Sequence, residues 1–374
     1  MTCDVVVVGL GGMGSAALAN VAMRGATALG IEQFERGHAN GSSTGRSRLI
    51  RKAYFEHPNY VPLLLRAYDA WEKLERLCGA RVLYKTSLLI AGHPQSSIVR
   101  GATRSAQAYD IPVEHLDARA IRTRFPAMRP LDDEIGLLEP DGGFVVPEAA
   151  VDGYLRVAQM HGAEARFETR VTSWSRNEAA AFEVRLADGT SVRGRRIVLC
   201  LGPWWRTFAQ TPLPVRLQRN VQVWFRPDSD AFSIETFPAF VLDRAGLPEP
   251  MYGFPDYGFG VKAAFHGLGA TIDAPDLLDR SVRPSDIEPL QTALARWMPG
   301  SAAAFIDAKA CLYSRTPDDN FVIGLQPDAP GVVVAGGFSG HGFKFASVVG
   351  EILADLALEG GTAYDLAFLA PRTA

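Results

Sequence analysis

Two pairs of basic side chains have spacings that could bring them to one chemical site. Lys262 and His266 are four residues apart in a mostly apolar run, and in a strand both side chains would point to the same face. Arg48 and Arg51 are three residues apart beside a glycine-rich loop, a spacing that places them on one face of a helix. A buried lysine is costly unless it is paired or used, and arginine suits bidentate capture of a carboxylate. The pattern alone leaves open a structural histidine and a solvated arginine face.

Two further segments combine a reactive or hydrogen-bonding group with a defined setting. Cys311 lies in an extended stretch, where a buried, inert thiol is the common outcome, and Lys309 and Arg315 would lower its pKa only if they face it. The run from Phe338 to Phe345 reads Phe-Ser-Gly-His-Gly-Phe-Lys-Phe and separates a buried strand from a helix. Amides at such a helix start favour negative charge. The run predicts either an anion site or a glycine turn with packed phenylalanines.

The N-terminal segment has the pattern of a dinucleotide-binding unit. Four consecutive valines, Val5 to Val8, predict a buried parallel strand, and the residues from Ser15 to Arg24 favour a helix. The glycines between them have the spacing GxGxxG, which allows a tight turn, close approach of a pyrophosphate and close packing of helix on strand. These glycines are Gly9, Gly11 and Gly14.

A second predicted strand, from Thr27 to Ile31, ends at Glu32, eighteen residues after Gly14. An acidic side chain at that place accepts hydrogen bonds from an adenosine ribose and disfavours a 2′-phosphate. The order of strand, motif, helix, strand and acid predicts a dinucleotide site, with a purely structural glycine turn as the alternative. The motif itself does not separate FAD from NAD.

The composition excludes several other functions. The chain has 374 residues with 38 basic and 41 acidic side chains, a net charge of −3, and 47% hydrophobic residues. This is typical of a folded protein of two or three domains and gives no electrostatic basis for binding nucleic acid or an anionic membrane. Four cysteines without CxxC spacing indicate neither a disulfide framework nor a metal site. We expect a cytoplasmic protein without a targeting segment, because four glycines interrupt the long uncharged N-terminal run.

The hydrophobic pattern predicts an α/β fold whose two domains are interleaved. Buried-strand patterns like that of the N-terminus recur at residues 196–202 and 331–337, whereas residues 215–313 alternate as in an antiparallel sheet. Other expected elements are helices at 60–77 and 147–158 and strands at 86–91, 135–139 and 164–171. We expect a Rossmann-like nucleotide-binding domain made of residues 1–82, 147–214 and 317–374, and an antiparallel-sheet substrate domain made of residues 83–146 and 215–316.

Several motifs together resemble one family of enzymes. They are the N-terminal glycine motif, Asn40-Gly41-Ser42, Arg48-Leu49-Ile50-Arg51, Tyr252-Gly253-Phe254-Pro255, Ala310-Cys311-Leu312-Tyr313 and the run 338–345. In these segments, and over nearly its whole length, the chain resembles the monomeric sarcosine oxidase and N-methyltryptophan oxidase family. These are FAD-dependent amine oxidases of the D-amino-acid oxidase superfamily. The resemblance implies that the nucleotide is FAD rather than NAD.

The resemblance also implies roles for residues that the local pattern leaves open. It implies a covalent thioether between the flavin and Cys311, and binding of a substrate carboxylate by Arg51 and Lys344. Lys262 matches the lysine that activates oxygen, and Arg48 matches an arginine against the flavin ring. The residues that match the substrate cavity are Tyr252, His266 and Tyr313. The cofactor would be bound by Gly9, Gly11, Gly12, Met13, Gly14, Glu32, Gln33, Ser42, Ser43, Arg48, Val171, Gly202, Trp204, Cys311, Gly340, Gly342, Phe343 and Lys344.

The reaction implied by the resemblance is oxidation of a secondary amine, such as an N-methyl amino acid, by a monomeric enzyme. The amine would become an imine that hydrolyses to an aldehyde and an amine, and O2 would be reduced to hydrogen peroxide. The alternative on the same fold is an oxidase or dehydrogenase of a cyclic or D-amino acid. A non-catalytic module that senses redox state is the alternative of another class.

The chain departs from the resembled family in the loop beside the expected flavin site and in the segment from Tyr252 to Lys262, which is one residue shorter. Where the family commonly has two histidines followed by Gly-Asp-Thr, the chain has Ser43, Thr44, Gly45, Arg46 and Ser47. A base therefore replaces an acid beside the expected flavin site. We further expect a roomy apolar cavity lined by Trp224, Phe240, Phe259 and Phe265.

Overall fold

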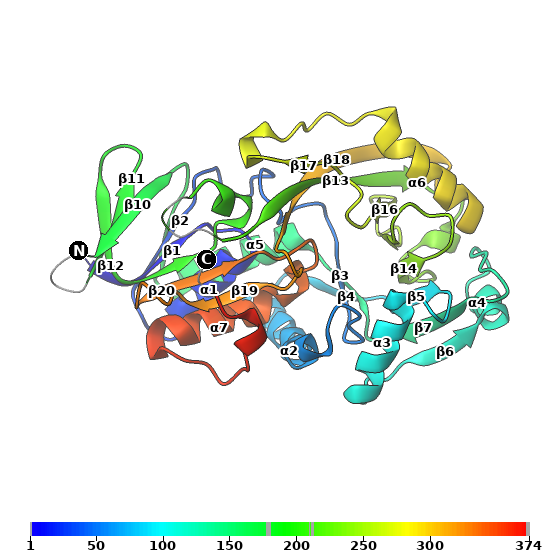
Figure 1. The fold of residues 1–374 in the computed structure, drawn as a ribbon, viewed down its shortest axis with the longest axis horizontal. Coiled ribbons are helices and arrows are strands. Elements are labelled where there is room, and N and C mark those ends of the chain that lie inside the picture. Colours follow the sequence, from blue (N-terminus) through cyan, green and yellow to red (C-terminus); the bar gives the residue numbers. More distant parts are fainter. Residues whose placement is uncertain (1, 177–180, 209, 211–212, 372–374) are drawn as a thin grey trace.

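The computed structural model describes residues 2–176, 181–208, 210 and 213–371. Its strands form two large sheets and one small sheet, and Figure 1 shows the two large sheets in opposite halves of the molecule. Two long strands, β13 (Arg216–Arg226) and β18 (Ala304–Arg315), run along the second half and extend toward the first sheet. Within these described ranges, no helix is long and apolar enough to cross a membrane.

Within the described residues, the first sheet has eight strands around a parallel centre. β1 pairs in parallel with β2 and β12, and β12 pairs in parallel with β20. Antiparallel strands extend the sheet, because β10 and β11 continue it beside β12, and β19 pairs with β20. The strands are β1 (Thr2–Val8), β2 (Ala28–Ile31), β9 (Glu164–Arg166), β10 (Val171–Arg176), β11 (Phe182–Leu186), β12 (Ser191–Leu199), β19 (Val322–Leu325) and β20 (Val332–Gly336).

Both faces of this sheet are buried, which explains the uninterrupted valines of β1. Val5 and Val7 pack into a core shared with the helices, whereas Val6 and Val8 pack into a second core on the opposite face. Figure 1 shows α1, α2 and α7 below the sheet. The helices of this half are α1 (Gly12–Met23), α2 (Val61–Cys78), α5 (Pro147–Met160) and α7 (Ala346–Glu359).

The second sheet has one apolar face and one face that carries polar side chains. Because successive side chains of a strand point to opposite faces, Val223 and Val261 enter the apolar core, and Gln222 and Lys262 face the other way. The strands are β5 (Leu88–Gly92), β6 (Glu114–Asp117), β7 (Ile135–Glu139), β14 (Ala239–Asp243), β15 (Met251–Phe254), β16 (Val261–Phe265), β17 (Thr271–Ile272), β13 and β18. Its helices are α3 (Ser97–Ala108), α4 (Ala118–Arg124) and α6 (Pro284–Trp297).

A small sheet connects segments from different parts of the chain and positions the arginine run. β8 (Gly143–Val145) lies between β3 (Arg48–Ile50) and β4 (Leu83–Lys85) and pairs antiparallel with both. Arg48 lies opposite Val145 in this ladder. β3 ends at Ile50 and Arg51 follows it directly. The pairing of β3 with β8 therefore fixes the backbone position of both arginines.

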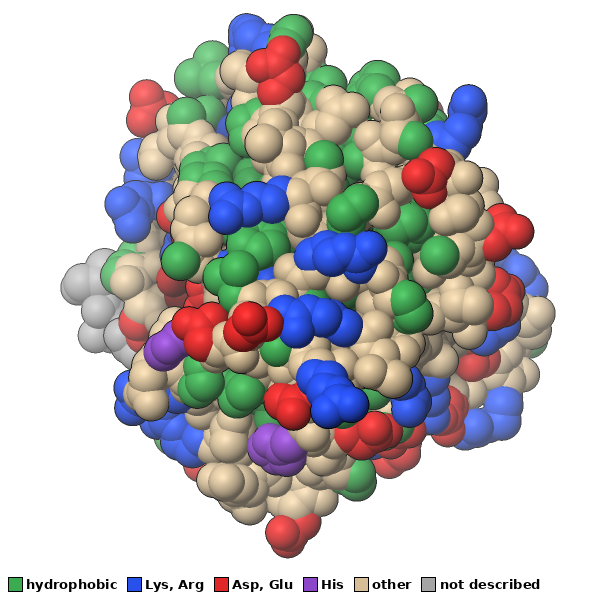
Figure 2. All heavy atoms as spheres, turned by 90° about the vertical axis from the view of Figure 1, so that its right-hand side faces the viewer, with side chains coloured by type: hydrophobic (Ala, Val, Ile, Leu, Met, Phe, Trp, Pro, Cys, Tyr) green, Lys and Arg blue, Asp and Glu red, His purple; other side chains and the backbone are tan. Residues whose placement is uncertain are grey.

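The surface does not concentrate one sign of charge on the face shown in Figure 2, which belongs to the half that contains the second sheet. Acidic and basic side chains lie next to one another across this face. The whole chain has a formal charge of −3. This face therefore offers no single-sign field of the kind that nucleic acid or an anionic membrane requires.

Some elements differ from the sequence-based predictions for identifiable reasons. The helical spacing predicted for Arg48 and Arg51 is wrong, because Arg48 lies in β3. The strand expected at 164–171 is split into β9 and β10, with Glu168 between them in the left-handed region at φ 52°. The second sheet is not wholly antiparallel, since β14 pairs in parallel with β5. The pattern also missed α3, α4 and α6.

Other predicted elements are confirmed. β7 occupies residues 135–139 as predicted, α5 begins at Pro147, and α2 lies within one residue of its predicted bounds. The strands of the first sheet come from three separated parts of the chain, residues 2–31, 164–199 and 322–336. This arrangement supports the two interleaved domains, a division that stays our proposal.

Candidate active site

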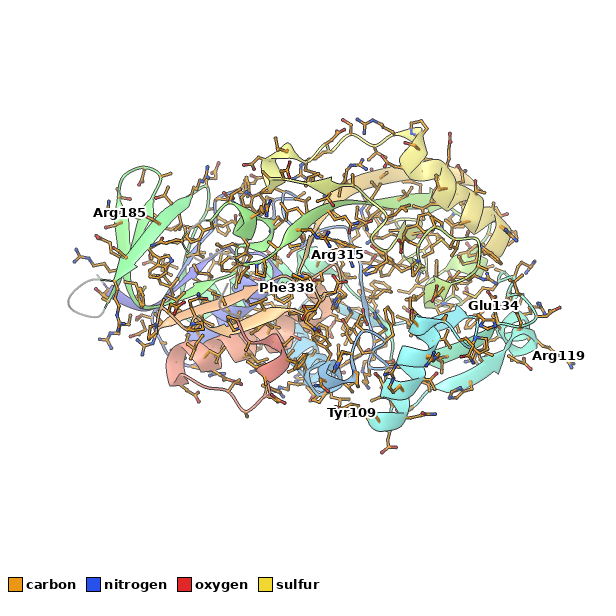
Figure 3. All side chains as sticks on the ribbon, viewed as in Figure 1. Tyr109, Arg119, Glu134, Arg185, Arg315 and Phe338 are labelled. Carbon is orange, nitrogen blue, oxygen red and sulfur yellow. The ribbon has the colours of Figure 1, made fainter. Side chains whose placement is uncertain are left out.

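A cavity of about 410 Å³ is lined by residues from both halves of the molecule. Among the site residues predicted from the sequence, all line this cavity except Gly14 and Lys262. Phe338 is one of the lining residues, and Figure 3 shows it near the middle of the molecule, with Arg315 close by in the view. The fold therefore brings together residues that are up to 336 positions apart in sequence, from Val8 to Lys344.

One end of the cavity is formed by the glycine motif at the start of α1. Gly11 caps the helix without a side-chain hydrogen bond, and the Gly12 amide donates to Ser43 Oγ at 2.9 Å. A Cβ at Gly14 would lie 1.7 Å from the Gly9 carbonyl oxygen, so a side chain there would separate α1 from β1. Glycine at position 14 therefore allows the first turn of α1 to pack closely against the residue that follows β1. The start of the helix stays open toward the cavity.

Glu32 lies at the end of β2 in the same part of the cavity and is held in one orientation. Its Oε2 accepts from the Leu10 amide at 2.8 Å, and its Oε1 accepts from the Phe34 amide at 3.2 Å. Burial raises the pKa of Glu32, but hydrogen bonds from His38 and the Leu10 amide outweigh that effect and the pKa is lowered. Glu32 is therefore an ionised acceptor at neutral pH.

Cys311 lies in the middle of the cavity wall, on the polar face of the second sheet. It is buried, and its Sγ accepts a hydrogen bond from Gln222 Nε2 at 3.2 Å. The neighbouring cations do not pair with the thiol, because Lys309 Nζ donates to Thr44 Oγ1 at 2.9 Å and Arg315 forms an ion pair with Asp319.

Arg48 lies near the thiol and is held without a carboxylate partner. Its Nη1 donates to the Ser47 carbonyl at 2.9 Å and to Gln222 Oε1 at 3.1 Å, and its Nη2 donates to the Ser42 carbonyl at 3.3 Å. Carbonyl and amide oxygens leave the positive charge of the guanidinium uncompensated. The middle of the cavity is therefore electropositive.

Lys262 lies on the same face of the sheet, behind the residues that line the cavity. Its Nζ donates to the carbonyls of Gly45 and Ser47, both at 2.7 Å, and lies 4.6 Å from the Phe254 ring centre. Burial and the charge of Arg48 lower the pKa of Lys262 well below its ordinary value. Lys262 is therefore held outside the cavity lining by carbonyls of the 45–47 loop.

Two buried cations, Arg51 and Lys344, line the cavity near a single carboxylate of the described chain, which pairs with Arg51 and not with Lys344. Arg51 Nη2 lies 2.7 Å from both oxygens of Glu56, while Arg51 Nε is buried without a hydrogen-bond partner in the described part of the chain. Lys344 Nζ donates to the His341 carbonyl. Burial and the charge of Arg51 lower the pKa of Lys344 well below its ordinary value. Burial raises the pKa of Glu56, but the charges of Arg51 and Lys344 and the hydrogen bonds from Arg51 bring it to about 2.

Three neutral aromatic side chains face these cations. The hydroxyls of Tyr252 and Tyr313 lie 3.4 Å apart, and the His266 ring centre lies 5.5 Å from that of Tyr313. Burial raises the pKa of Tyr252 to about 12 and that of Tyr313 well above its ordinary value. Burial also lowers the pKa of His266 to about 4. All three side chains are therefore uncharged at neutral pH.

His341 adjoins the cation pair and is also neutral. Burial lowers its pKa to about 3, against the opposing charge of Glu56, and burial raises the pKa of Tyr54 well above its ordinary value. The protonated Tyr54 hydroxyl therefore donates to His341 Nδ1, and Nε2–H donates to the Asp319 carbonyl at 3.0 Å. This hydrogen bonding fixes the segment that carries Lys344.

Four aromatic residues expected in the cavity are absent from its lining. Phe240 and Phe265 lie in the apolar core of the second sheet, because their strand positions point them to that face. Trp224 points to the polar face, but the Arg46 guanidinium covers it at 5.1 Å from the ring centre. Phe259 is 44% exposed and lies on the other side of the same guanidinium. The expectation of a large aromatic cavity is wrong.

Arg46 itself does not line the cavity, although it replaces an acid in the expected flavin loop. Its guanidinium is 3.3 Å from Asp307 and is directed toward Trp224 and Phe259. Sequence reasoning missed Glu56, whose acidic type next to Arg51 was an available signal. It also missed Gln222, for which the sequence gives no signal, because its contacts depend on how two strands pair.

The fold, glycine motif and Glu32 define a nucleotide-binding redox enzyme, and the chain belongs to the FAD dependent oxidoreductase family. The sequence model of that family matches residues 4–356. The glycine cradle at α1 and the orphaned Arg51 donor show that the cavity suits a nucleotide at one end and an anionic ligand at the other. The group that this site would hold is therefore FAD.

Named relatives cover almost the whole chain. It is 41% identical to a monomeric sarcosine oxidase of Streptomyces avermitilis over 99% of this chain and 97% of that protein. It is 34% identical to an N-methyl-L-tryptophan oxidase of Salmonella dublin, over 98% of this chain and 97% of that protein. Among solved structures, NikD, an amino acid oxidase of nikkomycin biosynthesis, superposes with a TM-score of 0.88 at 26% identity, covering 100% and 98% of the two chains.

We expect the stability of the protein to fall as the pH is lowered from 7 to 5, with His341 as one cause. Its pKa is about 3 in the folded protein and about 6.5 when unfolded, so below pH 6.5 protons bind the unfolded chain preferentially. The contribution of neutral His341 to the free energy of unfolding is therefore fully present above pH 6.5 and decreases as the pH falls below that value. Urea unfolding of the flavin-loaded protein at pH 5, 6 and 7 measures the slope.

The variant His341→Gln should flatten this slope, whereas His161→Gln, which changes an exposed histidine, should leave it unchanged. His266 contributes in the same direction, so the slope is reduced but not abolished in His341→Gln. An unchanged slope in that variant would contradict a neutral buried His341.

Proposed function

We propose that the protein oxidises a secondary amine that carries a carboxylate, most suitably an N-methyl amino acid, and passes the electrons to O2. The observation that carries this proposal is the pair of buried cations, Arg51 and Lys344, beside three neutral aromatic side chains. A cationic end and a neutral polar end in one cavity match a substrate with an anionic carboxylate and an uncharged amine. The names of the relatives support this substrate class.

The carboxylate would bind between Arg51 and Lys344. Arg51 Nε has no partner in the described residues, and its Nη2 is held by Glu56, so the guanidinium retains a free donor beside its bound edge. In the part of the chain that the structure describes, Lys344 Nζ donates only to the His341 carbonyl, so it can turn toward a stronger acceptor. Glu56 carries one negative charge, whereas Arg51 and Lys344 together carry two positive charges. A substrate carboxylate placed here would supply the second negative charge.

The amine would lie toward Tyr252, Tyr313 and His266. None of these side chains is charged at neutral pH, and the cations at the carboxylate end disfavour an ammonium group by like-charge repulsion. The cavity therefore favours the neutral amine, whose lone pair is needed for loss of hydride from the adjacent carbon. The imine that results would hydrolyse in water to an aldehyde and an amine.

When bound, FAD supplies the two-electron chemistry, and the chain supplies binding and orientation. The glycine motif and Glu32 would hold the nucleotide end, while Arg48 and the Gly340 to Phe343 segment would surround the ring system. Cys311 is the cavity thiol placed among these ring-side residues, and we propose that it forms a thioether with a methyl group of the ring. The new S–C bond would replace the S–H bond of Cys311 and one C–H bond of the methyl group, and O2 would take up the two hydrogens as hydrogen peroxide.

Lys262 is the residue we propose for oxygen activation. It lies on the sheet face that carries Cys311, next to Arg48, and within the described residues its Nζ donates hydrogen bonds only to the Gly45 and Ser47 carbonyls and to Ser47 Oγ. Burial and the charge of Arg48 lower the pKa of Lys262, and a negative charge that develops beside the lysine would raise that pKa and stabilise the ammonium form. Transfer of an electron to O2 creates such a charge, and a positioned ammonium group stabilises it.

The four free cysteines support our further proposal that the protein works in the cytoplasm, where thiols stay reduced. The resemblance to monomeric enzymes is the basis for proposing a monomer. Neither proposal affects the chemistry of the cavity.

We expect the purified protein to release hydrogen peroxide with N-methyl amino acids, measured by a peroxidase-coupled assay together with oxygen uptake. Lys344→Met should lower kcat/KM for sarcosine about 10- to 100-fold, since a hydrogen bond to a charged group is lost. The methyl ester of sarcosine, which has no carboxylate charge, should be affected much less.

Turnover of pipecolate or a D-amino acid, without turnover of any N-methyl amino acid, would contradict this substrate class. Reduction of an artificial dye without oxygen uptake would instead indicate a dehydrogenase. A colourless protein would favour the non-catalytic alternative.

Substituting Lys262 should separate the two half-reactions. In Lys262→Met, anaerobic reduction by substrate should stay within about twofold of the unsubstituted protein, while reoxidation by O2 slows on the order of 100-fold. Stopped-flow absorbance of the flavin measures both rates. Lys309→Met is a matched control, because Lys309 is near the thiol but is held by Thr44. Equal slowing of both half-reactions in Lys262→Met would refute the assignment.

Covalent attachment is tested by acid precipitation and a visible spectrum of the redissolved protein. We expect the yellow colour to remain with the unsubstituted protein and to be lost in Cys311→Ala, which should still bind FAD reversibly. Cys200→Ala is the matched control, since Cys200 also lines the cavity but at the nucleotide end. Colour that stays with Cys311→Ala would show that another residue is attached.

A further inference from the structure

Gln222 lies behind the cavity wall and contacts two residues that form it. Its side chain is 2% exposed and does not line the cavity. Its Nε2 donates to Cys311 Sγ at 3.2 Å, and its Oε1 accepts from Arg48 Nη1 at 3.1 Å. A single buried amide therefore bridges the thiol proposed for attachment and the arginine proposed to lie against the flavin ring.

The chemistry of Arg48 determines which way this amide points. A guanidinium has donors but no acceptor, so the atom of Gln222 that faces Arg48 must be the oxygen. The nitrogen then necessarily faces Cys311 and presents N–H to the sulfur. Such a donor favours a sulfur that carries negative charge, which is the reactive form of a cysteine.

The pairing of β13 with β18 explains why the residue is a glutamine. Asn220 lies directly opposite Cys311, and Gln222 lies opposite Lys309, so Gln222 is the diagonal neighbour of the thiol on the same face. The diagonal separation needs a long side chain. Although Asn220 is opposite the thiol, its buried Nδ2 has no hydrogen-bond partner in the described chain.

The loop that passes over this contact has a conformation that leaves room for it. Gly45 has φ +104°, and a Cβ there would lie 2.2 Å from Gln222 Oε1 and 2.8 Å from Arg48 Nη1. A side chain at position 45 would therefore push the amide and the guanidinium apart. The glycine, the arginine and the glutamine form one packed unit beside the thiol.

We propose that Gln222 is the positioning residue for flavin attachment: it holds Cys311 and Arg48 at one point of the cavity wall and directs an N–H donor to the sulfur. The proposal rests on the covalent link proposed above. Gln222 does not touch the cofactor, so its effect passes through the two residues it holds. Attachment depends on it, whereas reversible binding of FAD does not.

The experiment compares Gln222→Met and Gln222→Glu with the unsubstituted holoenzyme. Methionine keeps the volume but removes both hydrogen bonds, and glutamate keeps an acceptor for Arg48 but removes the donor to the thiol. For each protein, the covalent fraction is the flavin that stays with acid-precipitated protein divided by total flavin. Alkylation with iodoacetamide and mass spectrometry of the Cys311 peptide reports the unlinked thiol independently. We expect the covalent fraction to be about tenfold lower in both variants, with total flavin unchanged.

Gln218→Met is the matched control. Gln218 lies on the same strand and face, and its amide donates to the Gly267 and Gly269 carbonyls and accepts from Arg315. It contacts neither Cys311 nor Arg48, so its variant should keep the full covalent fraction.

Three outcomes would overturn the proposal. A full covalent fraction in Gln222→Met shows that the thiol needs no such support, and a full fraction in Gln222→Glu shows that the donor is not required. Loss of all flavin from Gln222→Met shows a general structural role instead. A fourth outcome, no covalent flavin in the unsubstituted protein, overturns the attachment through Cys311 itself and is seen before any variant is made.

Discussion

Burial of positive charge is the constraint on which the rest of this site depends. Arg48, Arg51, Lys262 and Lys344 lie in or directly behind one cavity, and within the described residues only Arg51 has a carboxylate at hydrogen-bonding distance. The others are held by backbone carbonyls and one amide oxygen, which orient the charges without neutralising them. A cavity of this kind gains free energy from any anion that enters it. A carboxylate substrate, a reduced flavin and a reduced form of oxygen all share that charge.

The loop from Thr44 to Ser47 makes this burial possible. Two of its residues, Gly45 and Arg46, have φ of 104° and 65°, in the left-handed region. In this conformation the amides of Gly45 and Arg46 point to the Glu148 carboxylate, and the carbonyls of Gly45 and Ser47 point to Lys262. The amide groups of the loop thus bind the carboxylate of Glu148, and its carbonyl groups bind the ammonium group of Lys262. The peptide groups of the loop lie between these two opposite charges.

The sequence predicted those parts of the site that depend on local pattern. The glycine spacing and Glu32 follow one another within a single strand-helix-strand unit, so their positions are fixed by short-range geometry. The placement of Lys262 on the polar face follows from strand periodicity, and the same periodicity puts Phe265 on the opposite face. The expectation that Phe265 lines the cavity ignored this alternation and was wrong.

Other parts could not be predicted because they depend on how distant segments pair. Arg48 is positioned by its ladder with β8, about 100 residues away, and not by its spacing from Arg51. Gln222 meets Cys311 only because of the register of β13 on β18. A one-residue change of register would turn every side chain of one strand to the other face. The alternation of apolar and polar residues within each strand excludes such a shift, but it does not distinguish registers that differ by two residues.

The order of strands in the first sheet has a consequence for biosynthesis. β20 pairs with the central strand β12 and, with α7, completes the core around β1, yet both elements lie in the last 43 residues of the chain. The ribosome makes the glycine motif first and these elements last, so the motif waits for almost the entire chain before its sheet is complete. The sheet that carries the glycine motif is therefore complete, with Cys311 in place beside the cavity, only after β20 and α7 have been made.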